Sequence, residues 1–215
     1  MSLYAPAPGP VSYMHRDDHL ILIDKPPGLL SVPGRGEEKA DCAIARVQAE
    51  FPDALTVHRL DMATSGLLMM ARSKEMQRAL SGLFERGEVE KSYLADVWGT
   101  PAPASGEIDL PLITDWPKRP LQKVDHEIGK PSRTLYETLV VSGGNARLKL
   151  MPLTGRSHQL RVHLAAIGHP ILGDEFYATG EALAARPRLA LHAARLSFAH
   201  PVTGERMDFE APCPF

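Results

Sequence analysis

Residues 58–66, H-R-L-D-M-A-T-S-G, place an arginine, an aspartate and two hydroxyl groups close together in a chain of 215 residues. An apolar run of strand length, residues 67–71, follows them. Asp61 is therefore expected on a loop that enters a buried strand, and catalytic groups concentrate on such loops. A carboxylate there could act as a nucleophile or a base. The alternative is a purely structural turn, because Asp, Thr, Ser and Gly are all common turn formers.

A basic segment, residues 128–173, stands out in a chain whose formal net charge is only −2. Glu137 is its one acidic residue. Local positive charge of this density is typical of a phosphate-binding surface, although such residues are often only solvated faces. The segment also contains an expected helix N-terminus at residues 154–157, which favours anion binding near Arg156 and His158. Its cations are Lys130, Arg133, Arg147, Lys149, Arg156 and Arg161, and Lys118, Arg119 and Lys123 precede it.

Two further residues could complete a site around the aspartate. Arg161 is the natural partner for Asp61, because a bidentate guanidinium would keep the carboxylate ionised and aimed in a site covered by substrate. The alternative for Arg161 is a surface ion pair of little energetic value. Tyr93, on an expected strand, could stack on a planar base or simply pack. The sequence leaves both choices open.

Several other chemistries lack their sequence patterns. His158 and His163 are five residues apart, which separates them around a helix and argues against a shared metal ion. No G-x-S-x-G elbow, phosphate loop or dinucleotide fingerprint is present, so no metal and no cofactor are expected. Cys42 and Cys213 form no C-x-x-C pair, which fits a reducing cytoplasm. No apolar run is long enough for a membrane span, and no membrane partner is expected.

The hydrophobic pattern predicts an α+β fold with a central mixed, mainly antiparallel sheet flanked by helices and loops. A Pro-rich arm, residues 1–12, is expected to precede a single catalytic domain, residues 13–215. Asp41 and Ser73 are expected to cap two helices, and no regular element is assigned to residues 100–133. The expected strands are 19–24, 67–71, 91–99, 134–141, 145–151, 189–199 and 206–210, and the expected helices are 42–51, the segment from Ser73 to Gly87, and 154–167.

Five ordered motifs resemble the RluA family of RNA pseudouridine synthases, over nearly the whole chain. They are K-P-P-G-L-L at 25–30, the segment 58–66, K-S-Y at 91–93, T-G-R-S-H-Q-L-R-V-H-L at 154–164 and L-H-A at 191–193. Three more match the short dual-specificity member of that family: V-P-G-R at 32–35, D-W-P-x-R-P at 115–120 and G-H-P-I-L-G-D at 168–174. The first motif begins near residue 25, so no N-terminal S4 RNA-binding domain is expected.

The resemblance implies a role for each residue of the site. Asp61 is the nucleophilic aspartate, Tyr93 stacks on the target uracil, and Arg161 pairs with the aspartate. Arg59 enters the RNA stack as the target nucleotide leaves it, and Leu191 packs at the uracil. Other predicted RNA contacts are Arg156, His158 and Thr64.

The implied activity is the isomerisation of uridine to pseudouridine in RNA stem-loops, with base flipping and without a cofactor. A tRNA anticodon stem-loop and 23S rRNA are the expected substrates of a cytoplasmic monomer. Two other functions remain open on the residues alone. One is an RNA-binding or chaperone module with a structural aspartate, and the other is a hydrolase that uses Asp61.

Overall fold

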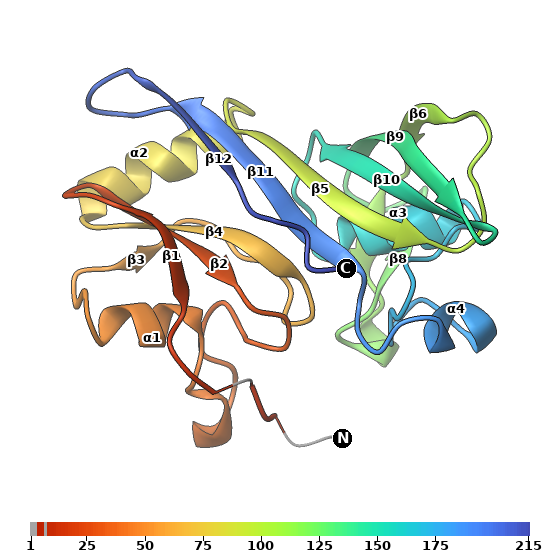
Figure 1. Ribbon diagram of the computed structural model, residues 1–215, viewed down its shortest axis with the longest axis horizontal. Helices are drawn as coiled ribbons and strands as arrows, with labels where there is room; N and C mark the ends of the chain where they lie inside the picture. The colour runs from red at the N-terminus through yellow and green to blue at the C-terminus, as the bar shows by residue number, and fades with distance from the viewer. Residues whose placement is uncertain (1–3, 7) are drawn as a thin grey trace. The chain divides into compact units, whose positions relative to one another are not determined.

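The computed structural model describes residues 4–6 and 8–215, and the chain forms two compact units (Figure 1). The first unit comprises Met1–Lys91 and Ala193–Pro214, and the second comprises Ser92–His192 with Phe215. The division points fall within strands β5 (Glu90–Val97) and β11 (Leu191–Ala199). The first unit is thus built from both ends of the sequence.

The sheet strands of the first unit follow the order β1-β2-β4-β11, with β12 paired to β11 and β3 paired to β4. Strand β4 is buried at every residue, which explains its unbroken apolar sequence. Its side chains form a core with those of β2, β11 and helix α2. The bounds are β1 (Ser12–Arg16), β2 (Leu20–Lys25), β3 (Leu55–Thr56), β4 (Ser65–Ala71) and β12 (Arg206–Glu210), with α1 (Ala43–Gln48), α2 (Lys74–Glu85) and the 3-10 turn η1 (Glu37–Lys39).

The two expected helix caps of this unit had different outcomes. The hydroxyl of Ser73 accepts a hydrogen bond from the backbone N–H of Met76 at 3.1 Å, so the predicted cap of α2 is confirmed. The prediction for Asp41 is wrong, because α1 begins after Cys42 and has no side-chain cap. The carboxylate of Asp41 instead binds the guanidinium of Arg46, with both contacts at 2.7 Å.

The larger sheet of the second unit follows the order β5-β10-β9-β6, and β7 and β8 form a separate two-stranded ladder. The predicted hairpin of β9 and β10 is confirmed, with Gly143 and Gly144 in its turn at positive φ. The bounds are β6 (Ser105–Asp109), β7 (Leu112–Thr114), β8 (Gln122–Val124), β9 (Arg133–Ser142), β10 (Asn145–Pro152), α3 (Gln159–Ala166), α4 (Gly180–Ala184) and the 3-10 turn η2 (Trp116–Lys118).

The expected helix over 154–167 begins later than predicted. Helix α3 starts at Gln159 because His158 adopts a left-handed conformation with φ 54°, which no helix residue can hold. The side chain of Gln159 accepts hydrogen bonds from Thr154 Oγ1 at 2.7 Å and from the N–H of Arg156 at 3.0 Å, and so stabilises a loop there. The predicted start of the helix at residues 154–157 is therefore wrong.

The α+β class, with a mixed, mainly antiparallel sheet and few helices, is confirmed. The strand registers between β1 and β2, β2 and β4, β5 and β10, and β9 and β10 are all antiparallel. No helix within residues 4–6 and 8–215 is long and apolar enough to cross a membrane.

Candidate active site

The eight residues predicted for the site lie in both units. The first unit contributes Arg59, Asp61 and Thr64. The second contributes Tyr93, Arg156, His158, Arg161 and Leu191.

Asp61 opens a turn that leads directly into the buried strand β4, as the sequence predicts. The turn is closed by a hydrogen bond from the N–H of Thr64 to the carbonyl of Asp61 at 3.1 Å. The Asp61 side chain is half-buried and Arg59 is exposed, so both can meet a ligand from solvent. Thr64, an expected RNA contact, is only 2% exposed and belongs to the support of the turn in this structure.

Lys25 fixes the carbonyl on one side of Asp61. Its ammonium group is fully buried and donates hydrogen bonds to the carbonyls of Pro26 at 2.9 Å, Leu29 at 2.8 Å and Met62 at 3.2 Å. The N–H of Gly28 also donates to the Met62 carbonyl, at 2.8 Å. Burying an ammonium group is costly unless its protons are hydrogen-bonded, and three carbonyls meet that need.

Ser31 fixes the backbone on the other side of Asp61. Its buried hydroxyl donates to the carbonyl of Leu60 at 2.7 Å and accepts from the N–H of the same residue at 3.0 Å. Both neighbours of Asp61 are thus bound to the segment 25–31. The sequence interpretation missed these two supports, although a lysine at the end of the apolar strand β2 was a visible signal.

Gly66 allows β4 to begin immediately after this turn. Its φ is +111°, and an added Cβ would lie 2.3 Å from the carbonyl oxygen of Ala193, in strand β11 of the same unit. Neither the conformation nor the space admits another residue. The final glycine of the segment 58–66 is therefore required by backbone packing.

His58 anchors the other end of the segment as a neutral residue. Its Nε2 accepts a hydrogen bond from the N–H of Met69 at 3.0 Å, and its ring lies 4.5 Å from that of Phe84. Burial lowers the pKa of His58 to about 3, and the positive charge of Lys91 acts in the same direction. His58 is therefore uncharged at neutral pH and serves the structure of the loop.

In the second unit, the guanidinium of Arg161 forms a buried bidentate ion pair with Asp174. Nε lies 2.8 Å from Oδ2 and Nη2 lies 2.6 Å from Oδ1, and the two side chains are 4% and 0% exposed. Asp174 Oδ1 also accepts from the N–H groups of Phe176 at 2.9 Å and Tyr177 at 3.3 Å. These bonds compensate the desolvation of both charges. The sequence interpretation did not foresee Asp174 as a partner of Arg161.

Two aromatic rings cover the same guanidinium. The carbon Cζ of Arg161 lies 4.9 Å from the ring centre of Phe176 and 5.2 Å from that of Tyr177. The hydroxyl of Tyr177 lies 2.7 Å from Nδ1 of His158, a predicted RNA contact. His158 therefore belongs to the support of Arg161 in this structure.

Gly173 permits the chain to turn into Asp174. Its φ is +71°, and an added Cβ would lie 2.1 Å from the carbonyl oxygen of Arg188. Only glycine fits there. Glycines thus adjoin both charged sites, Gly66 near Asp61 and Gly173 beside Asp174.

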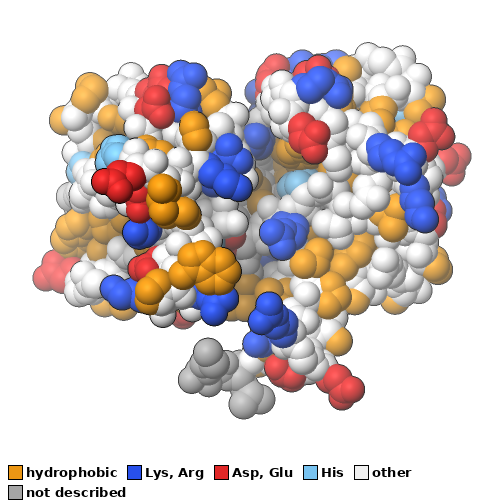
Figure 2. Space-filling model, turned by 180° about the vertical axis from the view of Figure 1, so that it is seen from behind, with side chains coloured by type: hydrophobic (Ala, Val, Ile, Leu, Met, Phe, Trp, Pro, Cys, Tyr) orange, Lys and Arg blue, Asp and Glu red, His pale blue; other side chains and the backbone are white. Residues whose placement is uncertain are grey.

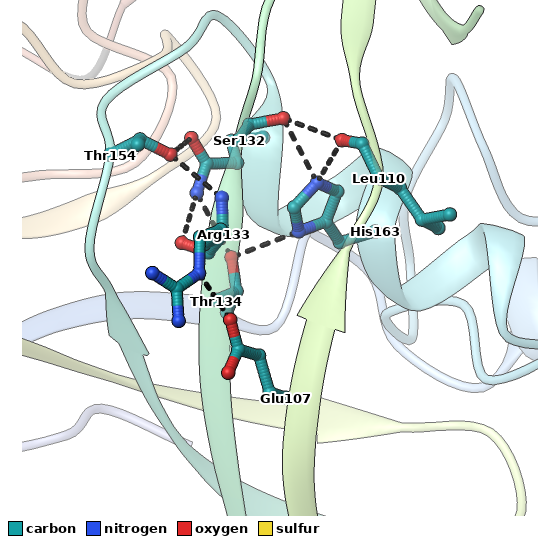
Figure 3. Close-up of polar contacts among 8 residues, drawn as sticks. Glu107, Leu110, Ser132, Arg133, Thr134, Thr154 and His163 are labelled. Atoms are coloured by element: carbon teal, nitrogen blue, oxygen red, sulfur yellow. Dashed lines mark hydrogen bonds and ion pairs between the residues drawn. The ribbon is translucent and has the colours of Figure 1, made fainter. Parts of the chain in front are cut away.

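The face of α3 opposite Arg161 is bound to strand β9 by a polar network (Figure 3). Gln159 donates to Thr134 Oγ1 at 3.0 Å, and His163 Nδ1 contacts the same oxygen at 3.0 Å. His163 Nε2 lies 3.0 Å from the carbonyl of Leu110, and burial lowers the pKa of His163. Residues 159 and 163 share one helix face, so Arg161 points away from β9. The network therefore sets the direction in which the arginine is presented.

Much of the charge in the basic segment is neutralised by acids from outside it. Arg133 pairs with Glu107, and Arg147 pairs with Asp96 at 2.7 Å. Arg161 pairs with Asp174, as above. Within residues 4–6 and 8–215, no ion pair involves Lys130, Lys149 or Arg156. Figure 2 shows lysine and arginine side chains on the surface of each unit, interspersed with acidic ones. Counting charges along the sequence overestimated the positive surface.

Of the remaining predicted residues, Tyr93 and Leu191 lie on strands and Arg156 lies in the loop before α3. Tyr93 lies on β5, half-buried, in register with Leu150 of β10. Leu191 is the first residue of β11 and is 3% exposed. Arg156 is exposed, and its Nε donates to the carbonyl of Pro131 at 3.2 Å.

The sequence profile of a family described as RNA pseudouridylate synthase matches residues 19–166. The chain belongs to this family. It is 54% identical over 203 residues to the dual-specificity RNA pseudouridine synthase RluA of Escherichia coli K12, covering 94% of this chain and 93% of the relative. It is 50% identical to the Pasteurella multocida protein of the same name, covering 99% and 98%.

Solved structures of the RNA pseudouridylate synthase family share the fold. Human RNA pseudouridylate synthase domain containing 1 superposes with a TM-score of 0.78 at 29% identity, covering 97% of this chain and 87% of that chain. Human RNA pseudouridylate synthase domain containing 4 superposes with a TM-score of 0.76 at 24% identity, covering 94% of this chain and 88% of that chain. The chain is an RNA pseudouridine synthase, an isomerase that acts on RNA, and the binding-module and hydrolase alternatives are set aside.

Proposed function

We propose that Asp61 is the catalytic carboxylate of this synthase and that Tyr93 and Arg161 act on the same uridine. In the reaction the N-glycosidic bond breaks, the base rotates, and a carbon–carbon bond forms to the same ribose. The product is an isomer of the substrate, so the reaction needs no group donor. The observation that carries the proposal is the turn of Asp61, where the backbone on both sides is fixed by Lys25 and Ser31 and the side chain is half-buried at the entrance to strand β4.

The proposed roles follow the resemblance to the family, residue by residue. Tyr93 stacks on the uracil, and Leu191 packs against it. Arg59 occupies the place of the uridine in the RNA stack, which is consistent with its exposure. Arg161 holds the carboxylate of Asp61 in its reactive state through its guanidinium, whose Nε and Nη2 already contact Asp174.

Arg156, His158 and Thr64 are proposed to support RNA binding. Arg156 is exposed and suits a phosphate contact. His158 and Thr64 would act mainly through the conformation of the loops that they stabilise. RNA affinity is expected to fall steeply with added salt, because cationic contacts to phosphate release counterions. Titration of labelled RNA at increasing KCl tests this, and a flat response would contradict it.

The proposed substrates are a tRNA anticodon stem-loop and a 23S rRNA hairpin, by analogy with the relatives named dual-specificity synthases. Loop uridines are poorly stacked, so flipping one costs less than in a duplex. We further propose that residues 13–215 act as one catalytic domain, in a cytoplasmic monomer.

Pseudouridine mapping in cells that lack the gene tests the substrate proposal. Pseudouridine is expected to disappear from one tRNA anticodon position and one 23S rRNA position, and to return with the wild-type gene. The gene carrying Asp61→Asn should restore neither position. Loss from only one RNA class would contradict the dual substrate, and restoration by Asp61→Asn would contradict the proposed role of the carboxylate.

A further inference from the structure

A small hairpin of the second unit carries an exposed tryptophan. Strands β7 and β8 are joined by residues 115–121, whose backbone is closed by hydrogen bonds from Asp115 N–H to the Leu121 carbonyl at 2.9 Å and from Leu121 N–H to the Lys118 carbonyl at 3.1 Å. At this well-bonded tip, Trp116 is 64% exposed, compared with 37% for Trp98. A large, exposed aromatic side chain held in place by a structured turn is typical of a binding surface.

The surroundings of Trp116 are cationic. The guanidinium carbon of Arg119 lies 4.4 Å from the centre of the indole ring and covers one face of it. Lys118 is exposed beside it, and within residues 4–6 and 8–215 neither cation forms an ion pair. An open aromatic face next to two positive side chains suits a nucleobase with its flanking phosphates. An apolar protein partner would gain nothing from the two charges.

The hairpin is fastened to the residues that hold Arg161. The N–H of Gln122, the first residue of β8, donates to the hydroxyl of Tyr177 at 2.9 Å. That hydroxyl also contacts His158 Nδ1 at 2.7 Å, and the Tyr177 ring lies 5.2 Å from the Arg161 guanidinium carbon. Tyr177, which packs on Arg161, thus also helps to position the hairpin.

We propose that the tip of the β7–β8 hairpin, residues 115–121, is an RNA contact outside the catalytic group. Trp116 stacks on an unpaired nucleobase of the substrate RNA, and Lys118 and Arg119 contact the adjacent phosphates. This inference rests on the RNA substrate proposed above and adds a binding element to it.

Tryptophan fluorescence tests the stacking directly, because the chain has only two tryptophans. In a Trp98→Phe variant the emission reports Trp116 alone, and in Trp116→Phe it reports Trp98 alone. Addition of an RNA stem-loop with the sequence of a tRNA anticodon arm should quench the first variant strongly and the second little. A fully paired duplex of the same stem should not quench either. Equal quenching by the duplex, or none by the stem-loop, would overturn the proposal.

Affinity and rate give a second test. Trp116→Ala should weaken stem-loop binding about 5- to 100-fold, with a smaller loss for Trp116→Phe. The single-turnover rate at saturating RNA should be unchanged. Val140→Ala, at another exposed apolar residue of this unit, serves as the control and should bind like wild type. Unchanged affinity of Trp116→Ala would overturn the proposal, as would a lower saturated rate without weaker binding.

The two proposals can fail separately. If Asp61→Asn retained full activity, the catalytic role of Asp61 would be lost, but quenching of Trp116 by stem-loop RNA would still support the hairpin contact. If quenching were absent while Asp61→Asn was inactive, only the hairpin contact would be overturned.

Discussion

The Asp61 turn of the first unit and the Arg161 site of the second hold charged side chains in opposite ways. Around Asp61 the protein fixes the backbone, through Lys25 and Ser31, and leaves the carboxylate half-buried. Around Arg161 it fixes the charged group itself, with a buried carboxylate and two aromatic rings. The first arrangement suits a group that changes its bonds during a reaction. The second suits a charge that must stay where it is.

Breaking the Arg161 site should have the largest effect on stability. Asp174→Asn removes the countercharge of a buried guanidinium while keeping the size of the side chain. We expect the free energy of unfolding to fall by about 3 to 5 kcal/mol, because an uncompensated charge remains buried. Urea denaturation followed by circular dichroism measures it.

Asp208→Asn is the matched control for that substitution. Asp208 pairs with Arg195 at the surface, where both side chains are exposed by about two-fifths, 43% and 39%. Loss of such a pair should cost less than about 1 kcal/mol. Equal losses in the free energy of unfolding of the two variants would mean that the buried ion pair of Arg161 contributes no more to stability than an exposed one.

Breaking the support of Asp61 should have a smaller effect on stability and a clear effect on rate. Lys25→Met keeps most of the aliphatic chain but leaves the carbonyls of Pro26 and Leu29 without their lysine donor. We expect a loss of about 2 kcal/mol in the free energy of unfolding. The single-turnover rate should fall about tenfold, because the turn is less well held.

The control here is Lys74→Met, at an exposed position in the first turn of α2. Its stability should change by no more than about 0.5 kcal/mol, with an unchanged rate. A Lys25→Met enzyme as fast as wild type would show that the backbone of the turn needs no such support.

The smallest expected effect concerns His58 and pH. The pKa of His58 is lowered to about 3 in the folded chain, so between about pH 3 and 6.5 the unfolded state binds more protons. Neutral His58 thus makes its full contribution to the free energy of unfolding above about pH 6.5, and this contribution is lost progressively as the pH falls toward 3. When the pH is lowered from 7.5 to 5.5, the free energy of unfolding of the wild type should fall by about 1.4 kcal/mol more than that of the His58→Gln variant. Identical losses in urea titrations would contradict a neutral, buried His58.

The sequence predicted most elements whose signals are local. The apolar run of β4, the cap at Ser73 and the turn at Gly143 and Gly144 all follow from short-range periodicity and turn chemistry. Asp61 at the entrance to a buried strand was predicted for the same reason. The strands within residues 100–133 were not predicted, because β6, β7 and β8 are only three to five residues long and lie among prolines.

The supports of the charged groups could not be predicted, because they depend on contacts between distant residues. Asp174 is thirteen residues from Arg161, and Ser31 is twenty-nine from Leu60. The late start of α3 depends on the left-handed conformation of His158, which propensity does not indicate for a non-glycine residue. Pairing of the basic segment with Asp96 and Glu107 likewise needs the folded sheet.

Pseudouridine formation by purified Asp61→Asn under single-turnover conditions tests the central claim most directly. The substitution keeps the size of the side chain and removes its charge. With saturating stem-loop RNA, the rate should fall more than about 10³-fold, while RNA affinity and the free energy of unfolding stay near the wild-type values. A folded, RNA-binding Asp61→Asn enzyme that forms pseudouridine at the wild-type rate would contradict the account.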